Sequence, residues 1–264
     1  MNTVLNSINI LVTRPKQQGL SLIKLIEQHG GTAINFPTLE IIPLINNQQI
    51  KTKLEYLADY QWHIFISANA VNFALQANNG KIESFKQAKI AAIGKATAKA
   101  LEEAGLIADL IPEIGFNSEA LLAMPPMQSL KNKKFLIIRG EGGRETLAQT
   151  LKERGATVDY LEVYKRVQPK ADNSAILALL AEKKIQAITI TSGEALHNLI
   201  AMLGNEIQAT LFNIPLIVIS ERIKQIAQDL GFKQVHVSAS PADTAIIKTV
   251  TTVCNGEDSG RRSN

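Results

Sequence analysis

The chain has 264 residues, 45% of them hydrophobic, which is enough for one large domain or two smaller ones, each with its own core. A single cysteine and four histidines without ligand spacing exclude disulfides and argue against a metal site. No apolar run has membrane-spanning length and residues 1–8 lack a signal-peptide pattern, so we expect a soluble, cytoplasmic protein without a membrane partner. The net charge of +4 suits an acidic ligand, but dispersed basic residues and only 5% aromatic residues argue against nucleic-acid binding.

Segments with strand and helix patterns alternate along the chain. Short apolar runs predict strands at 8–12, 33–37, 62–67, 89–94, 108–112, 134–139, 157–163, 187–192, 215–219 and 234–238. Between them, apolar residues recur at helical spacing, as Leu22, Leu25 and Ile26 do after the first strand. Such alternation predicts parallel, doubly wound sheets. Residues 255–264 are rich in Gly, Ser and Arg and predict a disordered tail.

The second half of the sequence repeats the first at an offset of about 125 residues. Arg14 aligns with Arg139, and Ser67 with Ser192, each next to a predicted strand. The alignment slips by one residue further along and then continues to the end of each copy. We interpret this pattern as a duplication with five strand and helix pairs per copy.

A glycine-rich turn follows the apolar run 135–138. Gly140, Gly142 and Gly143 allow a tight turn with free backbone N–H groups, and Arg144 is expected at the start of the next helix. Such a turn suits an anion, although it serves equally well as a simple chain reversal. It lacks the third glycine of a dinucleotide fingerprint and the Lys-Ser/Thr of a P-loop.

Two connections, 38–44 and 163–169, are extended and rich in β-branched residues instead of short. They occupy equivalent places in the two copies. Either the copies fold separately in sequence order, or each first β-α-β unit joins the remainder of the other copy and the connections form a two-stranded hinge. The pattern alone does not choose between these arrangements.

Seven short motifs occur in a characteristic order. They are VTRP at 12–15, FISANAV at 65–71, AIGKATA at 92–98, NSE at 117–119, RGEGGRE at 139–145, EVYKR at 162–166 and TSG at 191–193. In order and spacing they resemble the uroporphyrinogen-III synthases, over about residues 8 to 250. No single motif is decisive, because this family diverges widely.

The resemblance implies an α/β protein of two flavodoxin-like lobes with parallel sheets, joined by a two-stranded β hinge. This selects the exchanged arrangement. One lobe would hold residues 1–37 and 170–254 and the other 45–162, with hinge strands at 38–44 and 163–169 and a tail at 255–264.

The resemblance also implies an activity in haem biosynthesis. Family members are lyases that cyclise the linear tetrapyrrole hydroxymethylbilane to uroporphyrinogen III, with loss of water and inversion of ring D through a spiro intermediate. No metal, redox carrier or other cofactor is required. The substrate carries eight carboxylates, so an open cleft between the lobes with many anion contacts is expected. We expect a monomer and allow for transient contact with neighbouring enzymes of the haem pathway.

Site residues follow from matching the family motifs. Tyr164 matches the family's tyrosine and is the expected general acid, the alternative being a hinge tyrosine that only packs. Thr97 resembles a cleft threonine, but threonine is also common at helix starts. Gly94 and Thr97 form a Gly-x-x-Thr pattern in the first copy. The second copy lacks this pattern and has Ser220 and Arg222 in its place. The expected substrate contacts are Arg14, Ser67, Asn69, Gly94, Thr97, Asn117, Ser118, Arg139, Gly140, Gly142, Gly143, Arg144, Ser192, Gly193 and Ser220.

These contacts are of two kinds. Ser67, Gly94, Arg139, Ser192 and Ser220 fall at the carboxyl ends of predicted strands, where parallel sheets present ligand contacts and helix N-termini offer N–H groups. Arginines are expected to bind carboxylates as forked donors, although some of them serve only structural ion pairs.

Two alternatives compete with the enzyme. Two similar α/β lobes on a hinge also describe non-catalytic small-molecule receptors. A paired flavodoxin-like or receiver-like regulator would need a flavin phosphate loop or an acidic cluster at the strand ends, where this sequence has Ser, Gly and Arg instead.

Overall fold

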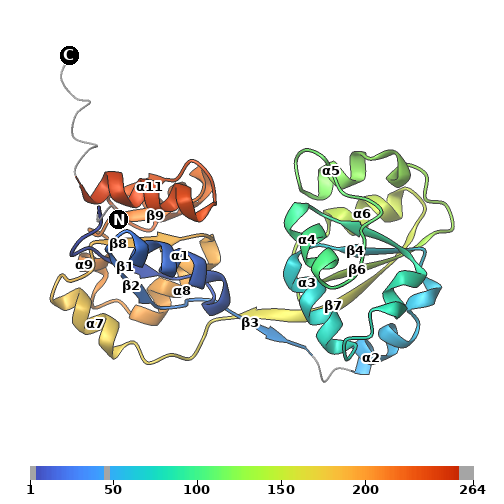
Figure 1. Cartoon of the computed structure of the whole chain (residues 1–264), viewed down its shortest axis with the longest axis horizontal. Helices are drawn as coiled ribbons and strands as arrows, with labels where there is room; N and C mark the ends of the chain where they lie inside the picture. Colours follow the sequence, from blue (N-terminus) through green and yellow to red (C-terminus); the bar gives the residue numbers. More distant parts are fainter. Residues whose placement is uncertain (1–3, 45–47, 256–264) are drawn as a thin grey trace, which may run out of the picture. The chain divides into compact units, whose positions relative to one another are not determined.

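The structure, a computed structural model, describes residues 4–44 and 48–255. The chain forms two compact units (Figure 1). Unit 1 comprises Met1–Glu40 and Val167–Asn264, and unit 2 comprises Ile41–Arg166. The chain therefore leaves unit 1 once and returns to it once.

Unit 1 is a five-stranded parallel sheet in the order β10-β9-β8-β1-β2. Its strands are β1 (Asn9–Val12), β2 (Thr32–Asn35), β8 (Ala187–Ile190), β9 (Leu216–Val218) and β10 (Val235–Val237). Its helices are α1 (Lys16–Gln28), α7 (Ser174–Ala181), α8 (Gly193–Leu203), α9 (Gln208–Leu211), α10 (Glu221–Asp229) and α11 (Asp243–Cys254).

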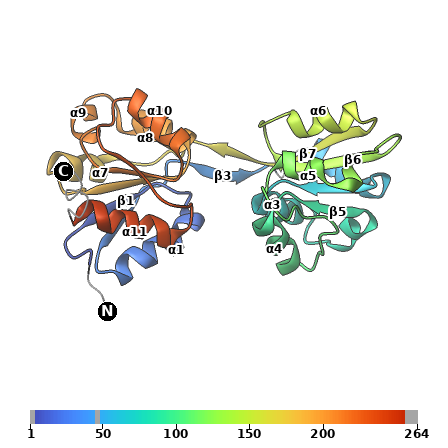
Figure 2. The same ribbon diagram turned by 90° about the horizontal axis from the view of Figure 1, so that it is seen from above.

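Helices cover both faces of this sheet (Figure 2). Ile10 and Val12 of β1 pack in one cluster with α1 and α11, whereas Leu11 packs in a second cluster with α7, α8 and α10. Successive side chains of a strand point to opposite faces, so a sheet buried on both faces needs an unbroken apolar run. Ile10, Leu11 and Val12 are all buried, which explains why β1 is an unbroken apolar run in the sequence.

Unit 2 is a five-stranded sheet in the order β3-β7-β6-β4-β5. Its strands are β3 (Glu40–Pro43), β4 (Trp62–Phe65), β5 (Lys89–Ala92), β6 (Lys134–Gly140) and β7 (Thr157–Val167), of which β7-β6-β4-β5 pair in parallel. Its helices are α2 (Gln48–Glu55), α3 (Ala68–Ala77), α4 (Lys95–Glu103), α5 (Ser118–Ala123) and α6 (Thr146–Glu153), with 3₁₀ turns at Leu57–Asp59, Glu83–Gln87 and Pro125–Met127. Helices α2, α3 and α4 pack with one face of the sheet, and α5 and α6 with the other.

Each sheet combines strands from both copies of the repeat. In unit 1, β1 pairs with β8, placing Ile10 opposite Ala187. In unit 2, β6 pairs with β4, placing Phe135 opposite Trp62. The strand orders correspond, since β2-β1-β8-β9 in one unit matches β7-β6-β4-β5 in the other. This is the exchanged arrangement, in which the first β-α-β unit of each copy completes the sheet of the other.

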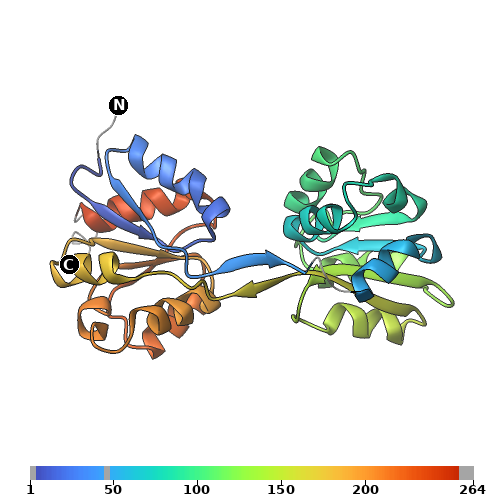
Figure 3. The ribbon, with the colours of Figure 1, turned by 90° about the horizontal axis from the view of Figure 1, so that it is seen from below.

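The two predicted connections are β-structured. β3 lies within 38–44, and β7 continues through eleven residues to Val167 (Figure 3). The strands are neighbours in the sheet of unit 2, and the Leu44 N–H donates to the Val163 carbonyl.

Two local predictions are wrong. The segment 108–112 forms only a single bridge, Ala91 to Leu110, instead of a strand. Asp109 turns its side chain to accept from the Ile90 N–H, and Pro112 has no N–H to donate to a ladder. Helix α6 begins at Thr146, so Arg144 lies in the turn and not at the helix start.

Two further expectations concern the ends of the chain and the membrane. Apart from Asn255, the predicted tail lies outside the described residues. Within the part that the structure describes, no helix has both the length and the apolar character needed to cross a bilayer.

Candidate active site

Three predicted serines have the same local role at strand-to-helix junctions. Ser67, Ser192 and Ser220 each lie two residues beyond the end of a strand and cap the next helix. Their hydroxyl oxygens accept the backbone N–H three residues on, at 3.1, 3.0 and 3.4 Å. Because the N–H groups of the first helical turn have no partner within the helix, such a cap typically stabilises by ~1 kcal/mol. The serines thus have a structural reason to be there, whatever they bind.

Other predicted residues at these junctions differ in exposure. Asn117 caps α5, accepting the Ala120 N–H at 2.8 Å, and is exposed. Gly94 precedes α4 without a side-chain cap. Thr97, in the first turn of α4, is only 3% exposed, so its side chain faces the core more than solvent.

Tyr164 lies on β7 with its ring inside unit 2. The residue is 2% exposed, and its ring centroid is 5.5 Å from that of Phe73. Its hydroxyl lies 3.2 Å from Ser67 Oγ, where either oxygen can donate. Since the strand order is β7-β6-β4, the ring crosses β6 to reach the end of β4.

Gly140 provides the space for that crossing. A Cβ atom at this position would lie 2.6 Å from Cζ and 3.0 Å from Cδ2 of Tyr164. Real Cβ atoms essentially never approach so closely, so any other residue would push the ring away. The glycine is therefore explained by the tyrosine that passes over it.

The glycine turn is only partly free to bind an anion. The Glu141 N–H donates to the Tyr164 carbonyl at 2.7 Å, and the Gly142 N–H donates to Glu162 Oε1 at 3.3 Å. Gly142 and Gly143 have φ of 70° and 110°, the region that favours glycine. Among residues 4–44 and 48–255, no acceptor is bonded to the N–H groups of Gly143 and Arg144.

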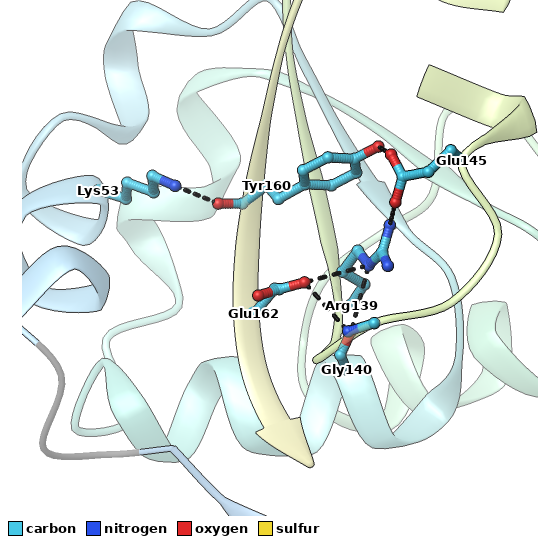
Figure 4. A network of polar contacts seen from close by, with 7 residues as sticks. Lys53, Arg139, Gly140, Glu145, Tyr160 and Glu162 are labelled. Carbon is cyan, nitrogen blue, oxygen red and sulfur yellow. Dashed lines mark hydrogen bonds and ion pairs between the residues drawn. The ribbon is translucent and has the colours of Figure 1, made fainter. Parts of the chain in front are cut away.

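Arg139 is buried in an internal polar network (Figure 4). Its Nη1 lies 3.0 Å from Glu145 Oε1, and its Nε lies 3.5 Å from Glu162 Oε1. Its guanidinium carbon lies 4.5 Å from the ring centroid of Tyr160, whose hydroxyl donates to the other oxygen of Glu145. Lys53 Nζ donates to the Tyr160 carbonyl at 2.5 Å. Arg139 thus makes structural ion pairs that hold the glycine turn against β7.

This network shifts the pKa of two side chains in opposite directions. Burial, followed by the bond to Glu145, raises the pKa of Tyr160 to about 12. The hydrogen bond from Tyr160, followed by that from Arg139, lowers the pKa of the Glu145 carboxyl. A carboxylate whose pKa is lower in the folded state stabilises the fold above its ordinary pKa, and this contribution disappears as the pH falls through the lowered value.

We expect Glu145→Gln to lower the melting temperature at neutral pH. The difference from wild type should shrink as the pH falls below about 4.5, where the carboxyl of the unfolded chain becomes protonated, and should disappear once the pH is below the lowered pKa of the folded state. Thermal unfolding measured from pH 3 to 8 checks this. Glu141→Gln is the matched control, an exposed carboxylate on the same turn without a side-chain partner in the described structure, and a pH-independent deficit in Glu145→Gln would contradict the assignment.

Of the three predicted arginines, only Arg144 is both exposed and without an ion pair to a residue that the structure describes. Arg14, in unit 1, has Nη1 at 2.5 Å from Asp243 Oδ1 and donates to the Pro241 carbonyl at 3.2 Å. Arg139 is paired as described above. Arg144 is exposed and has no ion pair with any residue that the structure describes.

A pocket of about 300 Å³ gathers several predicted residues at the carboxyl edge of the unit 2 sheet. Asn117, Ser118, Arg139 and Arg144 line it, together with Tyr160. A larger pocket of about 690 Å³ in unit 1 lies at the amino-terminal ends of β1, β8 and β9, and no predicted site residue lines it. Strand carboxyl ends are where open α/β sheets bind ligands, so the smaller pocket is the better candidate.

The predicted residues fall into separate groups. Ser67, Asn69, Gly94, Thr97, Asn117, Ser118, Arg139, Gly140, Gly142, Gly143, Arg144 and Tyr164 belong to unit 2, and Arg14, Ser192, Gly193 and Ser220 belong to unit 1. Several side chains of the unit 2 site were not predicted, among them Phe116, Glu145 and Tyr160. The sequence did contain a sign of Tyr160. It lies two residues before Glu162 on a strand that pairs with the strand of Arg139, so Tyr160 and Glu162 lie on the same face of the sheet.

The sequence has clear relatives. The family model described as Uroporphyrinogen-III synthase HemD matches residues 21–248. The chain belongs to the uroporphyrinogen-III synthase family. It is 30% identical over 245 residues to the uroporphyrinogen-III synthase of Escherichia coli K12, covering 92% of this chain and all of that protein. It is 35% identical over 161 residues to that of Proteus mirabilis, covering 61% of this chain and 81% of the relative.

Solved uroporphyrinogen-III synthases share the fold. A mutant of the Thermus thermophilus protein gives a TM-score of 0.64 at 15% identity, covering 94% of this chain and 99% of that one. The Helicobacter pylori 26695 protein gives 0.60 at 15% identity, covering 93% and 99%. These likenesses confirm the predicted two-domain α/β fold. Family membership confirms the predicted function, a cyclising lyase of tetrapyrrole biosynthesis.

Proposed function

We propose that this uroporphyrinogen-III synthase uses the carboxyl edge of the unit 2 sheet to cyclise hydroxymethylbilane. Family membership over residues 21–248 is the observation that carries the reaction. In that reaction the ring A hydroxymethyl group loses its hydroxyl as water, ring D attacks through its substituted carbon, and the spiro intermediate rearranges with ring D inverted. The bilane closes unaided to the uninverted isomer, so the protein's task is to select geometry and to protonate one leaving group.

The Tyr164 and Ser67 pair is the proposed proton donor. A phenol carries its proton at neutral pH and can donate it to a leaving hydroxide. Ser67 Oγ accepts the Ala70 N–H and can also accept from the Tyr164 hydroxyl 3.2 Å away, which leaves its own hydrogen free to donate outward. Because Ser67 is half-buried and Tyr164 is buried, the serine hydroxyl would pass the proton to substrate and the tyrosine would replace it.

Arg144 and the free N–H groups of the glycine turn are the proposed carboxylate contacts in unit 2. A guanidinium without an internal partner loses no ion pair when it binds a carboxylate. The pocket of about 300 Å³ lies at the small end of the ligand-pocket range, so it would hold one substituted pyrrole ring and not the whole tetrapyrrole. The predicted contacts in unit 1, which include Ser192, Gly193 and Ser220, remain proposals for other carboxylates.

We expect Arg144→Gln to raise KM about tenfold with a smaller effect on kcat, because a charge-assisted bond to substrate is lost. The free energy of unfolding should change by less than about 0.5 kcal/mol, since the side chain is exposed and forms no ion pair with a described residue. Steady-state kinetics at several salt concentrations check this. The control Lys131→Gln removes one charge near the amino-terminal end of β6 and should leave KM unchanged. If both variants raise KM equally, Arg144 acts only through the net charge of the protein and does not contact the substrate.

The decisive test generates hydroxymethylbilane in the presence of the purified protein, oxidises the products and separates the type I and type III porphyrin isomers. Type III formed in proportion to added protein is the expected result. Type I alone, with the bilane still bound, would leave a two-lobed binding protein. We further propose that the protein acts as a monomer in the cytoplasm, which size-exclusion chromatography with light scattering and cell fractionation test.

A further inference from the structure

Phe116 has two unusual features for an apolar residue. It is 43% exposed, whereas most large apolar side chains of this protein are buried. Its φ is 38°, in the left-handed region that bulky residues rarely adopt. Strained backbone of this kind persists only where the surroundings hold it, and it is concentrated at functional sites.

The surroundings of Phe116 hold the residue in place. A Cβ atom at Gly94 would lie 3.0 Å from the Phe116 Cβ, so the two segments approach closely here and a larger residue at position 94 would press on Phe116. Lys95 places its Nζ 5.1 Å from the centroid of the Phe116 ring. The ring is therefore fixed over the start of α4 and presents aromatic surface beside a cation.

The same ring lines the pocket that contains Arg144. Asn117, Ser118 and Glu119 complete this side of the pocket, so an aromatic wall stands next to polar groups and charges of both signs, among them the unpaired guanidinium of Arg144 in the described structure. A flat, apolar ring that carries short acidic side chains is complementary to that combination. A pyrrole of the tetrapyrrole substrate, with its acetate and propionate, has this chemistry.

We propose that Phe116 packs against the face of one pyrrole ring and so determines where that ring sits, while Arg144 and Lys95 face its carboxylates. This inference rests on the proposed function. Binding of a pyrrole ring would explain both the exposure of the Phe116 side chain and its strained backbone. The competing explanation is purely local: Phe116 precedes the α5 cap Asn117, and a residue at that position often packs against a buried residue of the first helical turns, here Leu121.

Three substitutions separate the two explanations. Phe116→Leu keeps an apolar side chain for packing on α5 but removes the aromatic face, and Phe116→Tyr keeps the aromatic face. We expect Phe116→Leu and Phe116→Ala to raise KM about tenfold and Phe116→Tyr to retain the wild-type value. Ile114→Ala, a change at the 84% exposed neighbour on the same loop, is the control and should have no effect.

A binding measurement gives a second readout that does not depend on catalysis. Uroporphyrin III, a stable oxidised tetrapyrrole, is titrated with each variant and its fluorescence anisotropy is recorded. The dissociation constant should rise about tenfold for Phe116→Leu and stay unchanged for Phe116→Tyr, with equal melting temperatures for both variants. If Phe116→Leu binds uroporphyrin III and turns over like wild type, the ring only packs and the inference is wrong. A wild-type protein that forms no type III isomer would instead overturn the proposed function, and this inference with it.

Discussion

Tyr164→Phe should reduce the rate of type III formation by about 10²- to 10⁴-fold, the range for loss of general acid help. It removes only the hydroxyl, so the ring still packs over Gly140 and against Phe73. The free energy of unfolding should fall by only ~1 kcal/mol, the usual cost of one lost hydrogen bond. Single-turnover kinetics and denaturant unfolding of the same preparation check both numbers. Equal proportional losses of rate and stability would assign Tyr164 to packing alone.

The duplication supplies a matched control for the loss of the helix cap at Ser67. Ser67→Ala and Ser192→Ala each remove a helix cap at equivalent junctions, so each should cost ~1 kcal/mol of stability. Ser67 contacts the Tyr164 hydroxyl as well, whereas the Ser192 hydroxyl accepts only the Ala195 N–H in the described structure. If the pair relays a proton, adding Tyr164→Phe to Ser67→Ala should lower the rate only slightly further, because both changes interrupt one path.

The fold could be predicted because its signals are local and repeated. An apolar run that is buried on both faces of a sheet, as Ile10 to Val12 is, looks the same in the sequence wherever the strand finally pairs. Serine two residues after a strand marks a helix start for a reason that lies within four residues of chain. The prediction of a strand at 108–112 was wrong because Pro112 and the side chain of Asp109 disrupt regular pairing next to β5, at the edge of the unit 2 sheet.

The roles of the site residues depended on partners that the sequence does not place. Arg139 and Arg144 occur in one motif and look equivalent as carboxylate ligands. In the fold, Arg139 is buried and faces the partly exposed Glu162 of the neighbouring strand, whereas Arg144 lies in the open turn. Gly140 likewise looked like an anion-binding glycine, and only the crossing of the Tyr164 ring shows why a side chain is excluded there.

That crossing leads to the prediction with the broadest effect. Gly140→Ala places a methyl group 2.6 Å from Cζ of a ring that is 2% exposed, so the ring must leave its site. We expect a loss of about 1–3 kcal/mol in the free energy of unfolding, the usual cost of overpacking a core. Turnover should also fall to the level of Tyr164→Phe or below, because the displaced hydroxyl no longer reaches Ser67.

A double-mutant cycle with Tyr164→Ala shows whether the clash is the cause. Without the ring, the added methyl group has space, so Gly140→Ala should cost less than about 0.5 kcal/mol when it is made in the Tyr164→Ala variant. The coupling energy should then account for most of the stability that Gly140→Ala loses in the wild-type protein. Gly142→Ala is the control for backbone strain alone: its φ is 70°, and no atom of residues 4–44 and 48–255 lies within 4 Å of the added Cβ. Its cost should be ~1–2 kcal/mol and independent of residue 164. If Gly140→Ala is equally costly with and without the Tyr164 ring, the clash with the ring is not the cause, and the link between the turn and the proton donor is lost.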